Sequence, residues 1–208
     1  MNIRIGLIVG GALLVSACSM EASPGRMAQE ARAAEGEDPS SAENLFEALS
    51  AYCGLAFAGG VASNDERDAD WAGQTLVMHV RECSDDEIRI PLHVGEDRSR
   101  TWVVTRTEDG FRLKHDHRHE DGSEDVLTQY GGDSSIVEPG RIEFPADEFS
   151  RELFVAEGIE ASAQNVWLMQ VEGSTFTYGL DRPDRTFRAV FDLSNPVDAP
   201  PAPWGFED

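Results

Sequence analysis

The spacing of apolar residues changes near Cys53, from a helical period of about 3.6 residues to the period of 2 that is typical of β-strands. Ahead of that point, Ser40 precedes Glu43 by three residues, which is the spacing of a helix-capping box. The apolar residues that follow share one helical face: Leu45, Phe46, Leu49 and Tyr52. We therefore predict a short amphipathic helix over residues 41–52.

Beyond Cys53, apolar and polar residues alternate in short runs that turn residues separate. The alternation is clearest in residues 88–94 and 187–193, and Asp121-Gly122 and Gly173-Ser174 are typical hairpin turns. The pattern predicts strands over residues 55–61, 76–82, 88–94, 101–107, 111–119, 126–130, 141–144, 166–172, 175–180 and 185–193.

One further helix is predicted over residues 147–157. The other connections are too short for the crossovers that parallel strands need, so neighbouring strands are expected to run antiparallel. We predict an all-β, mainly antiparallel fold, which is a single barrel or sandwich of roughly nine or ten strands with one or two short helices.

Near its start the chain has a cationic residue, Arg4, followed by the apolar run Ile5–Val15. This run is shorter than the roughly 20 residues needed to cross a bilayer, and the arrangement is typical of a signal peptide. The run ends in the string Leu14-Val15-Ser16-Ala17-Cys18. This string resembles the lipobox of bacterial lipoproteins, in which small residues precede the cleaved bond and the cysteine receives diacylglycerol. The resemblance implies a lipoprotein signal peptide over residues 1–17 and lipidation of Cys18. The alternative is an ordinary signal peptide that leaves Cys18 as a spare thiol.

Residues 18–40 are rich in Ala, Glu, Ser and Gly and poor in large apolar side chains, which predicts an acidic flexible tether. A β domain is predicted over residues 41–208. Ser19 follows Cys18, where an aspartate would resemble an inner-membrane retention signal. The predicted location is therefore the bacterial cell envelope, on the outer membrane and facing the periplasm, with the membrane as a partner through the lipid anchor.

The chain has 208 residues, with 17 Lys and Arg against 39 Asp and Glu, so its formal charge is −22. Nucleic acid is not an expected partner, because binding it requires a basic surface. At 40% hydrophobic residues, the chain can bury the core of one domain. The segment Arg98-Ser99-Arg100 is interpreted as a turn whose arginines offset nearby acids, with anion binding as the alternative.

Two cysteines, Cys53 and Cys83, remain once Cys18 is assigned to lipidation. An exported protein meets an oxidising compartment, and an even number of cysteines favours a disulfide between them. The alternative is a reactive thiol or redox centre, for which the chain lacks a CxxC motif.

All five histidines lie between residues 79 and 119, and three of them alternate along one predicted strand. His115, His117 and His119 continue the apolar face of that strand, so we predict that they line any pocket in the fold. Two histidines at this spacing, either His115 and His117 or His117 and His119, could hold zinc or another transition metal with a further ligand from elsewhere. The first pair is the preferred candidate. His79 and His93 are expected on the opposite face of their strands. The alternatives are a polar ligand pocket without metal and a structural network with nearby carboxylates.

The chain contains no G-x-S-x-G, P-loop or HExxH motif. Gly132-Asp133-Ser134 is similar to an esterase nucleophile block, but no histidine follows it in the sequence. The acidic run over residues 116–125 departs from the EF-hand pattern, because Arg118 occupies a ligand position. We therefore assign no catalytic residue.

Several strings in the predicted β domain occur together over residues 52–205. They are Glu96–Trp102, Leu113–Gly122 (with the motif HDHRHEDG), Tyr130–Gly132, Phe144–Asp147 and Pro203–Gly205. This combination resembles a family of uncharacterised secreted bacterial proteins. The resemblance implies export and a compact domain, and it implies no activity.

The favoured hypothesis is an envelope lipoprotein that binds a small-molecule ligand or an envelope protein without catalysis. One alternative is a metal-dependent hydrolase that uses a His-x-His pair, and another is a structural or assembly-factor lipoprotein. A deep cavity reached by the histidines favours the first two hypotheses, whereas a filled core with an exposed apolar patch favours the third.

Overall fold

The computed structural model describes residues 42–138 and 140–207, which belong to one unit, Pro39–Asp208. The predicted signal peptide, the lipidation residue Cys18 and the predicted tether lie outside the described residues. No helix within the described ranges combines the length and apolar character that crossing a bilayer requires.

The described elements are mostly strands. The helices are α2 (Ala42–Ser50), α3 (Ala69–Ala72) and α4 (Glu148–Ala156), with 3-10 turns η1 (Glu66–Asp68) and η2 (Glu160–Gln164). The strands are β1 (Ala56–Val61), β2 (Leu76–His79), β3 (Glu82–Cys83), β4 (Glu87–Val94), β5 (Asp97–Thr107), β6 (Gly110–His117), β7 (Tyr130–Asp133), β8 (Ile136–Glu138), β9 (Arg141–Pro145), β10 (Val166–Glu172), β11 (Thr175–Arg182) and β12 (Arg185–Val197).

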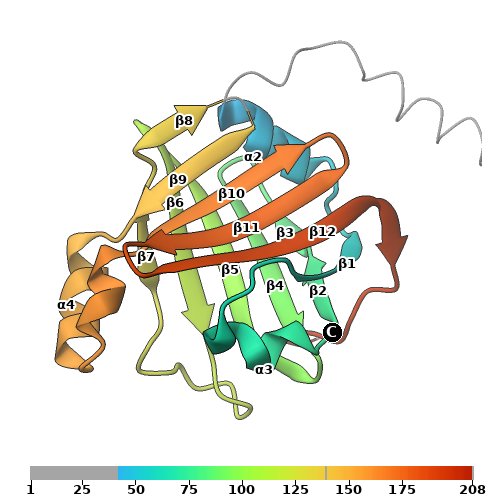
Figure 1. Ribbon diagram of the computed structural model, residues 1–208. Coiled ribbons are helices and arrows are strands. Elements are labelled where there is room, and N and C mark those ends of the chain that lie inside the picture. Colours follow the sequence, from blue (N-terminus) through green and yellow to red (C-terminus); the bar gives the residue numbers. More distant parts are fainter. Residues whose placement is uncertain (1–41, 139, 208) are drawn as a thin grey trace, which may run out of the picture. The chain divides into compact units, whose positions relative to one another are not determined.

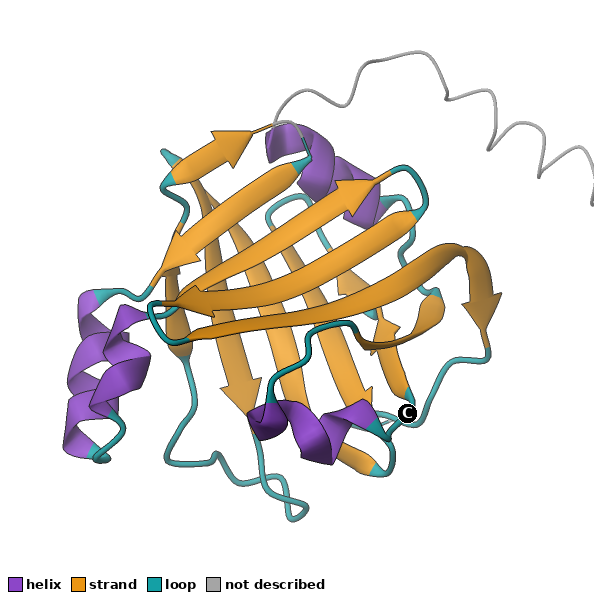
Figure 2. Cartoon of the chain, viewed as in Figure 1, coloured by secondary structure: helices purple, strands orange, loops and turns teal. Residues whose placement is uncertain are grey.

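The strands form one antiparallel sheet that curls into a nearly closed barrel (Figures 1 and 2). Their order is β7-β6-β5-β4-β2-β1-β12-β11-β10-β9-β8, with β3 paired to β4. The first and last strands pair with each other, since Gly60 of β1 lies opposite Val190 of β12. The predicted all-β antiparallel fold is therefore confirmed, and it takes the barrel form.

The two ends of the sheet meet where α4 begins. Asp147 N donates to Gly131 O at 2.9 Å, which links the start of the helix to β7. Gly131 N donates to the buried Ser150 Oγ at 2.7 Å, and the Asp147 side chain caps the helix by accepting from Ser150 N. Polar contacts from α4 thus take the place of a strand ladder at this seam.

One end of the barrel is filled and covered by α2 (Figure 1). Leu45 and Leu49 of α2 are fully buried, and the Phe46 ring stacks on Phe111 with centroids 5.5 Å apart. The Arg106 guanidinium lies over the Phe46 ring at 4.6 Å. The predicted amphipathic helix is therefore stabilised by burial of its apolar face against the barrel.

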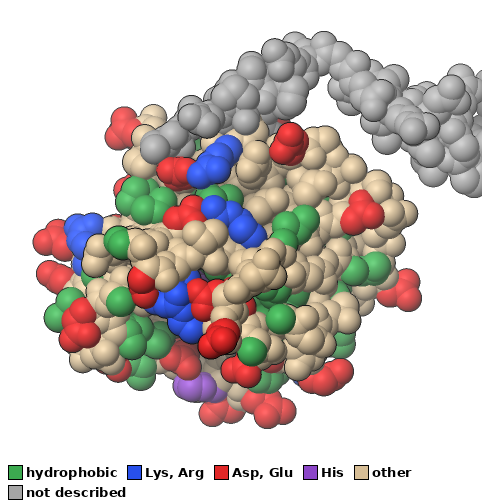
Figure 3. Space-filling view, viewed as in Figure 1, with side chains coloured by type: hydrophobic (Ala, Val, Ile, Leu, Met, Phe, Trp, Pro, Cys, Tyr) green, Lys and Arg blue, Asp and Glu red, His purple; other side chains and the backbone are tan. Residues whose placement is uncertain are grey.

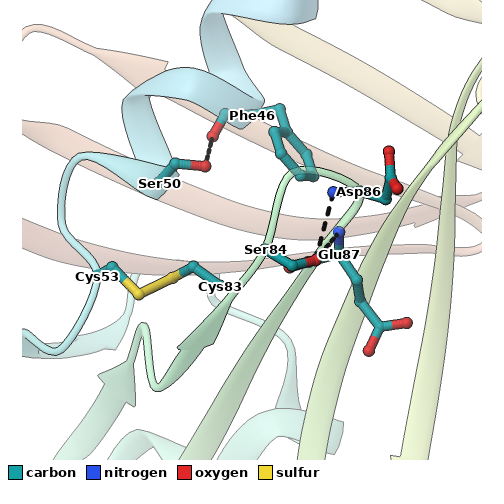
Figure 4. The surroundings of a disulfide bond; sticks show 7 residues. All are labelled: Phe46, Ser50, Cys53, Cys83, Ser84, Asp86 and Glu87. Carbon is teal, nitrogen blue, oxygen red and sulfur yellow. Dashed lines mark hydrogen bonds between the residues drawn. A yellow bond between two sulfur atoms is a disulfide. The ribbon is translucent and has the colours of Figure 1, made fainter.

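A disulfide joins Cys53, three residues after α2, to Cys83 of β3, as predicted (Figure 4). The Cα atoms are 6.2 Å apart, and 30 positions separate the two residues in the chain. Just beyond Cys83, Ser84 Oγ accepts hydrogen bonds from the backbone N–H groups of Asp86 and Glu87 and so forms the turn into β4. The bond ties the segment after the capping helix to the sheet.

The predicted strand over residues 126–130 is wrong, because the chain forms a loop until β7 begins at Tyr130. Thr128 Oγ accepts the hydrogen bond of His117 N at 2.9 Å, where a strand would offer a carbonyl. Val126 is 63% exposed, so its apolar side chain does not mark a buried strand face. The short elements β3, β8 and α3 were not predicted as separate elements, because a segment of two to four residues is too short to show a periodic pattern.

We predict that Gly131→Ala weakens the seam between the sheet ends. Gly131 has a φ of +156°, and a Cβ there would lie 1.8 Å from Leu113 O, so alanine forces the backbone to move. The expected loss in the free energy of unfolding is more than about 2 kcal/mol, measured by urea unfolding. Gly60→Ala is the control, because a Cβ on Gly60 meets no atom within 4 Å. Equal losses in both variants would contradict the prediction.

We also predict that replacing Cys53 and Cys83 together by serine lowers the free energy of unfolding by about 3 kcal/mol, because the bond closes a long loop in the unfolded chain. The wild-type protein should lose a similar amount in reductant, and the double variant should be insensitive to reductant. Urea unfolding with and without reductant measures both effects. A reductant-insensitive wild type would show that the bond adds nothing to stability.

Candidate functional site

The end of the barrel away from α2 holds a cavity of about 440 Å³. Two cross-strand pairs of β5 and β6 show the separation: Arg100–His117 lines the cavity, whereas Arg106–Phe111 contacts α2. Six residues of strand separate these pairs, which corresponds to about 20 Å. The lining residues are Arg67, Asp68, Trp71, Leu92, Arg100, Trp102, His115, His117, Asp125, Leu127, Tyr130, Phe154, Ile159, Ser162, Asn165, Trp167, Tyr178, Leu180, Arg182, Arg185 and Phe187.

The inner wall of the cavity is aromatic. Trp102 of β5 stacks on Tyr178 of β11 with ring centroids 4.3 Å apart. His115 of β6 stacks on Tyr130 of β7 at 4.5 Å and lies 5.2 Å from the Trp167 ring of β10. Rings from opposite sides of the barrel thus meet and support one another, so the wall is held in place by packing as well as by the sheet.

His115 is the central polar group of this wall and is 2% exposed. Its Nδ1 lies 3.1 Å from Tyr130 O, and its Nε2 lies 2.7 Å from the Tyr178 hydroxyl. Burial, with a smaller effect of the neighbouring His117, lowers the pKa of His115 from 6.5 to about 3. The ring is therefore neutral at neutral pH, and both of its nitrogens are engaged.

His117 lies nearer the mouth of the cavity, and its Nε2 is 3.3 Å from the Tyr130 hydroxyl. Burial and then the charge of Arg100 lower the pKa of His117 to about 4. Burial raises the pKa of both Tyr130 and Tyr178 above the usual value of 10. The titratable groups of the inner wall are therefore uncharged at neutral pH.

The structure separates His119 from the other two histidines, which corrects the prediction that all three line the pocket. Strand β6 ends at His117, and Arg118 then bridges to Glu124 across a turn. The His119 side chain is 56% exposed and lies 3.8 Å from Asp125. Side chains alternate between the two faces of a sheet only within a strand. Because β6 ends at His117, this alternation does not extend to His119, and its side chain is exposed to solvent.

His93 is buried, at 4% exposure, although the alternation of β4 predicts the outer face of the sheet for it. The outer surface beside it is partly covered, since Trp204 N of the C-terminal segment donates to Arg98 O at 3.1 Å. Burial and the charge of Arg98 lower the pKa of His93 to about 4. His93 is not among the residues that line the cavity.

The predicted metal pair, His115 and His117, is brought to the cavity, with ring centroids 6.3 Å apart. Within the described ranges, no group of three or more His, Cys, Asp or Glu side chains is placed to hold a metal ion. Since both nitrogens of His115 already have partners, zinc binding there requires these hydrogen bonds to break. The metal site and the hydrolase that depends on it stay predictions without support from the geometry.

Arginines surround the mouth of the cavity. Arg100 lies in the segment that is interpreted from the sequence as a turn with anion binding as the alternative, whereas the sequence predicts no role for the other arginines. Arg98-Ser99-Arg100 is not a turn but part of β5, and Arg100 has the same inward parity as Trp102. Arg182 shares the parity of the cavity residues Tyr178 and Leu180 on β11. This parity is the signal that could have identified both arginines. On the face in Figure 3, most basic side chains lie beside acidic ones.

The chain has no match among protein-family models, curated proteins or solved structures. The two resemblances stated from the sequence therefore stay predictions, and the geometry of the cavity carries the functional argument.

We predict that buried histidines make the fold sensitive to acid. His115 has a pKa of about 3 in the folded chain against the ordinary histidine value of 6.5, so the unfolded chain binds more protons between these values. The free energy of unfolding therefore falls as pH falls through this window, by up to about 1.4 kcal/mol per pH unit for one such group.

The measurement is urea unfolding at about pH 6.5 and about pH 5.5, above the range near pH 4 in which most carboxylates titrate. His115→Gln should show a flatter dependence than the wild type, because the titrating ring is gone. His119→Gln is the matched control on the exposed turn and should keep the wild-type dependence. A wild-type slope in His115→Gln would contradict the prediction.

Proposed function

We propose that the protein is a non-catalytic binding module of the bacterial envelope that holds a small organic molecule in the barrel cavity. The observation that carries this proposal is the cavity itself, whose volume of about 440 Å³ falls in the range of ligand sites. Its inner wall is mainly aromatic, and a few polar groups converge on it from several strands. That combination is typical of a site that encloses an apolar ligand body and orients it by hydrogen bonds.

The state of the polar groups supports binding over catalysis. A general base or nucleophile needs a free, reactive atom facing the substrate. His115 has hydrogen-bond partners at both ring nitrogens, and Tyr178 is one of them. Tyr130 and Tyr178 keep their protons because burial raises the pKa of both hydroxyls. The inner wall therefore offers fixed, neutral hydrogen-bonding groups.

Export and membrane attachment form part of the same proposal. The lipobox string that ends at Cys18 supports a lipid anchor, and the Cys53–Cys83 disulfide suits an oxidising compartment. The described chain begins with α2 at Ala42, at the end of the barrel away from the cavity.

The test uses the chain Ser19–Asp208, secreted to an oxidising periplasm behind a cleavable signal, and the neutral fluorescent probe N-phenylnaphthylamine. We predict saturable binding of one probe per chain with quenching of tryptophan fluorescence, because Trp102 and Trp167 line the cavity. Leu127→Trp, which places a larger side chain in the cavity lining, should weaken probe binding by about tenfold or more.

Val126→Trp is the matched control, since Val126 is the exposed neighbour of Leu127 and does not line the cavity. It should bind the probe as the wild type does. Probe binding that is absent, or that is equally strong in Leu127→Trp, would overturn the proposed function. Native mass spectrometry of the purified chain provides a second readout for any molecule that stays bound.

A further inference from the structure

We propose that the cavity selects organic anions, in which a ring-shaped apolar body lies against the aromatic wall and one carboxylate or sulfonate group is held by arginines at the mouth. This inference rests on the proposed function and names the class of ligand. Three inward-facing arginines carry it: Arg100 on β5, Arg182 on β11 and Arg185 on β12.

Arg100 is placed to anchor the anionic group. It lies opposite His117 and Leu92 in the neighbouring strands, and its guanidinium stacks over the Trp71 ring at 5.0 Å. Its Nη1 is held by Asp97 and by Ser99 Oγ. Within the described ranges its other nitrogens have no hydrogen-bond partner, so they remain available to a bound anion.

The charge of Arg100 reaches the inner wall. After burial, it is the next cause that lowers the pKa of His117, and it partly offsets the burial that raises the pKa of Tyr130 and Tyr178. These residues lie on β6, β7 and β11. Asp97 pairs with Arg100 and offsets part of its charge, but the effect of Arg100 on His117 is larger than that of any single acid. An anion that contacts the free nitrogens of Arg100 would form an ion pair in partly desolvated surroundings, where such a pair is stronger than at an open surface.

Two further arginines line the same cavity and form a pair of like charges. Arg182 and Arg185 lie directly opposite each other in the β11–β12 ladder, an arrangement that costs energy when both side chains are charged. Asp184 accepts from Arg182 Nε at 2.8 Å, and the nearly buried Asp68 pairs with Arg185. The two carboxylates offset the repulsion and hold the arginines in place.

The acids that line the cavity are already engaged, which argues against a cationic ligand. Asp68 accepts from Ser63 Oγ at 2.7 Å and also pairs with Arg185. Asp125 accepts from Leu127 N at 2.8 Å and lies 3.8 Å from His119. The acids thus have cationic or N–H partners, whereas Arg100 keeps unused donors.

A buried amide adds a further requirement on the ligand. Asn165 is 5% exposed and lines the cavity, and its Oδ1 has no hydrogen-bond partner within the described ranges. A buried acceptor without a partner is costly, so a ligand that donates an O–H or N–H to it gains affinity. The preferred ligand is accordingly an aromatic or alicyclic acid that also carries a hydroxyl or N–H group.

The test compares two probes that differ by one sulfonate group. Anilinonaphthalene sulfonate carries a sulfonate, and N-phenylnaphthylamine is its neutral counterpart with the same rings and N–H group. On the chain Ser19–Asp208 at low salt, we expect the anionic probe to bind about tenfold more tightly. Arg100→Gln should reduce the affinity for the anionic probe by about tenfold and the affinity for the neutral probe much less, so the ratio of the two affinities falls.

Arg112→Gln is the control for net charge, because Arg112 pairs with Asp133 and does not line the cavity. It should keep the preference for the anionic probe. Equal affinity for the two probes, or a preference that survives Arg100→Gln, would overturn the anion inference while cavity binding stands. The proposed function itself fails in a different way, namely when Leu127→Trp leaves the binding of both probes unchanged.

Discussion

The pairing of the first strand with the last is the constraint on which the rest of the structure depends. Because β1 bonds to β12 as well as to β2, a meander of short hairpins becomes a barrel, and all inward side chains must share one enclosed volume. The remaining gap is closed by α4, through Ser150 and Asp147 on Gly131. Without this closure, the aromatic rings of β5, β6, β10 and β11 would lie on an open sheet and would not face one another.

The enclosed volume is filled unevenly along the barrel axis. Near α2, phenylalanine and leucine side chains interlock, as in any close-packed core. Toward the other end, the interior changes from bulky rings such as Trp102 and Trp167 to polar groups and arginines. The charged ends of the arginines are solvated or paired. A cavity forms there because charged side chains cannot fill a barrel interior as densely as apolar ones without losing hydration.

For anion binding, the position of the arginines matters more than the net charge of the chain. A chain with 17 basic and 39 acidic residues repels anions at long range, yet four of its arginines line the cavity. Long-range repulsion is screened by salt, whereas a short contact in a desolvated mouth is not. The chain can thus be strongly acidic overall and still present a local site for an anion.

The sequence predicts most of the strands, their antiparallel direction, the Cys53–Cys83 pairing and the inward orientation of His115 and His117. These properties follow from local alternation, from short connections and from cysteine number. The predicted strand over residues 126–130 is a loop in the structure. Three-dimensional packing was needed to show that His119 lies outside the site, that Arg100, Arg182 and Arg185 converge on one mouth, and that a cavity remains between them. Convergence depends on the register between strands distant in the chain, and a cavity depends on the volume that facing side chains fail to fill. Neither the register between distant strands nor the unfilled volume can be read from the hydrophobic pattern of a single segment.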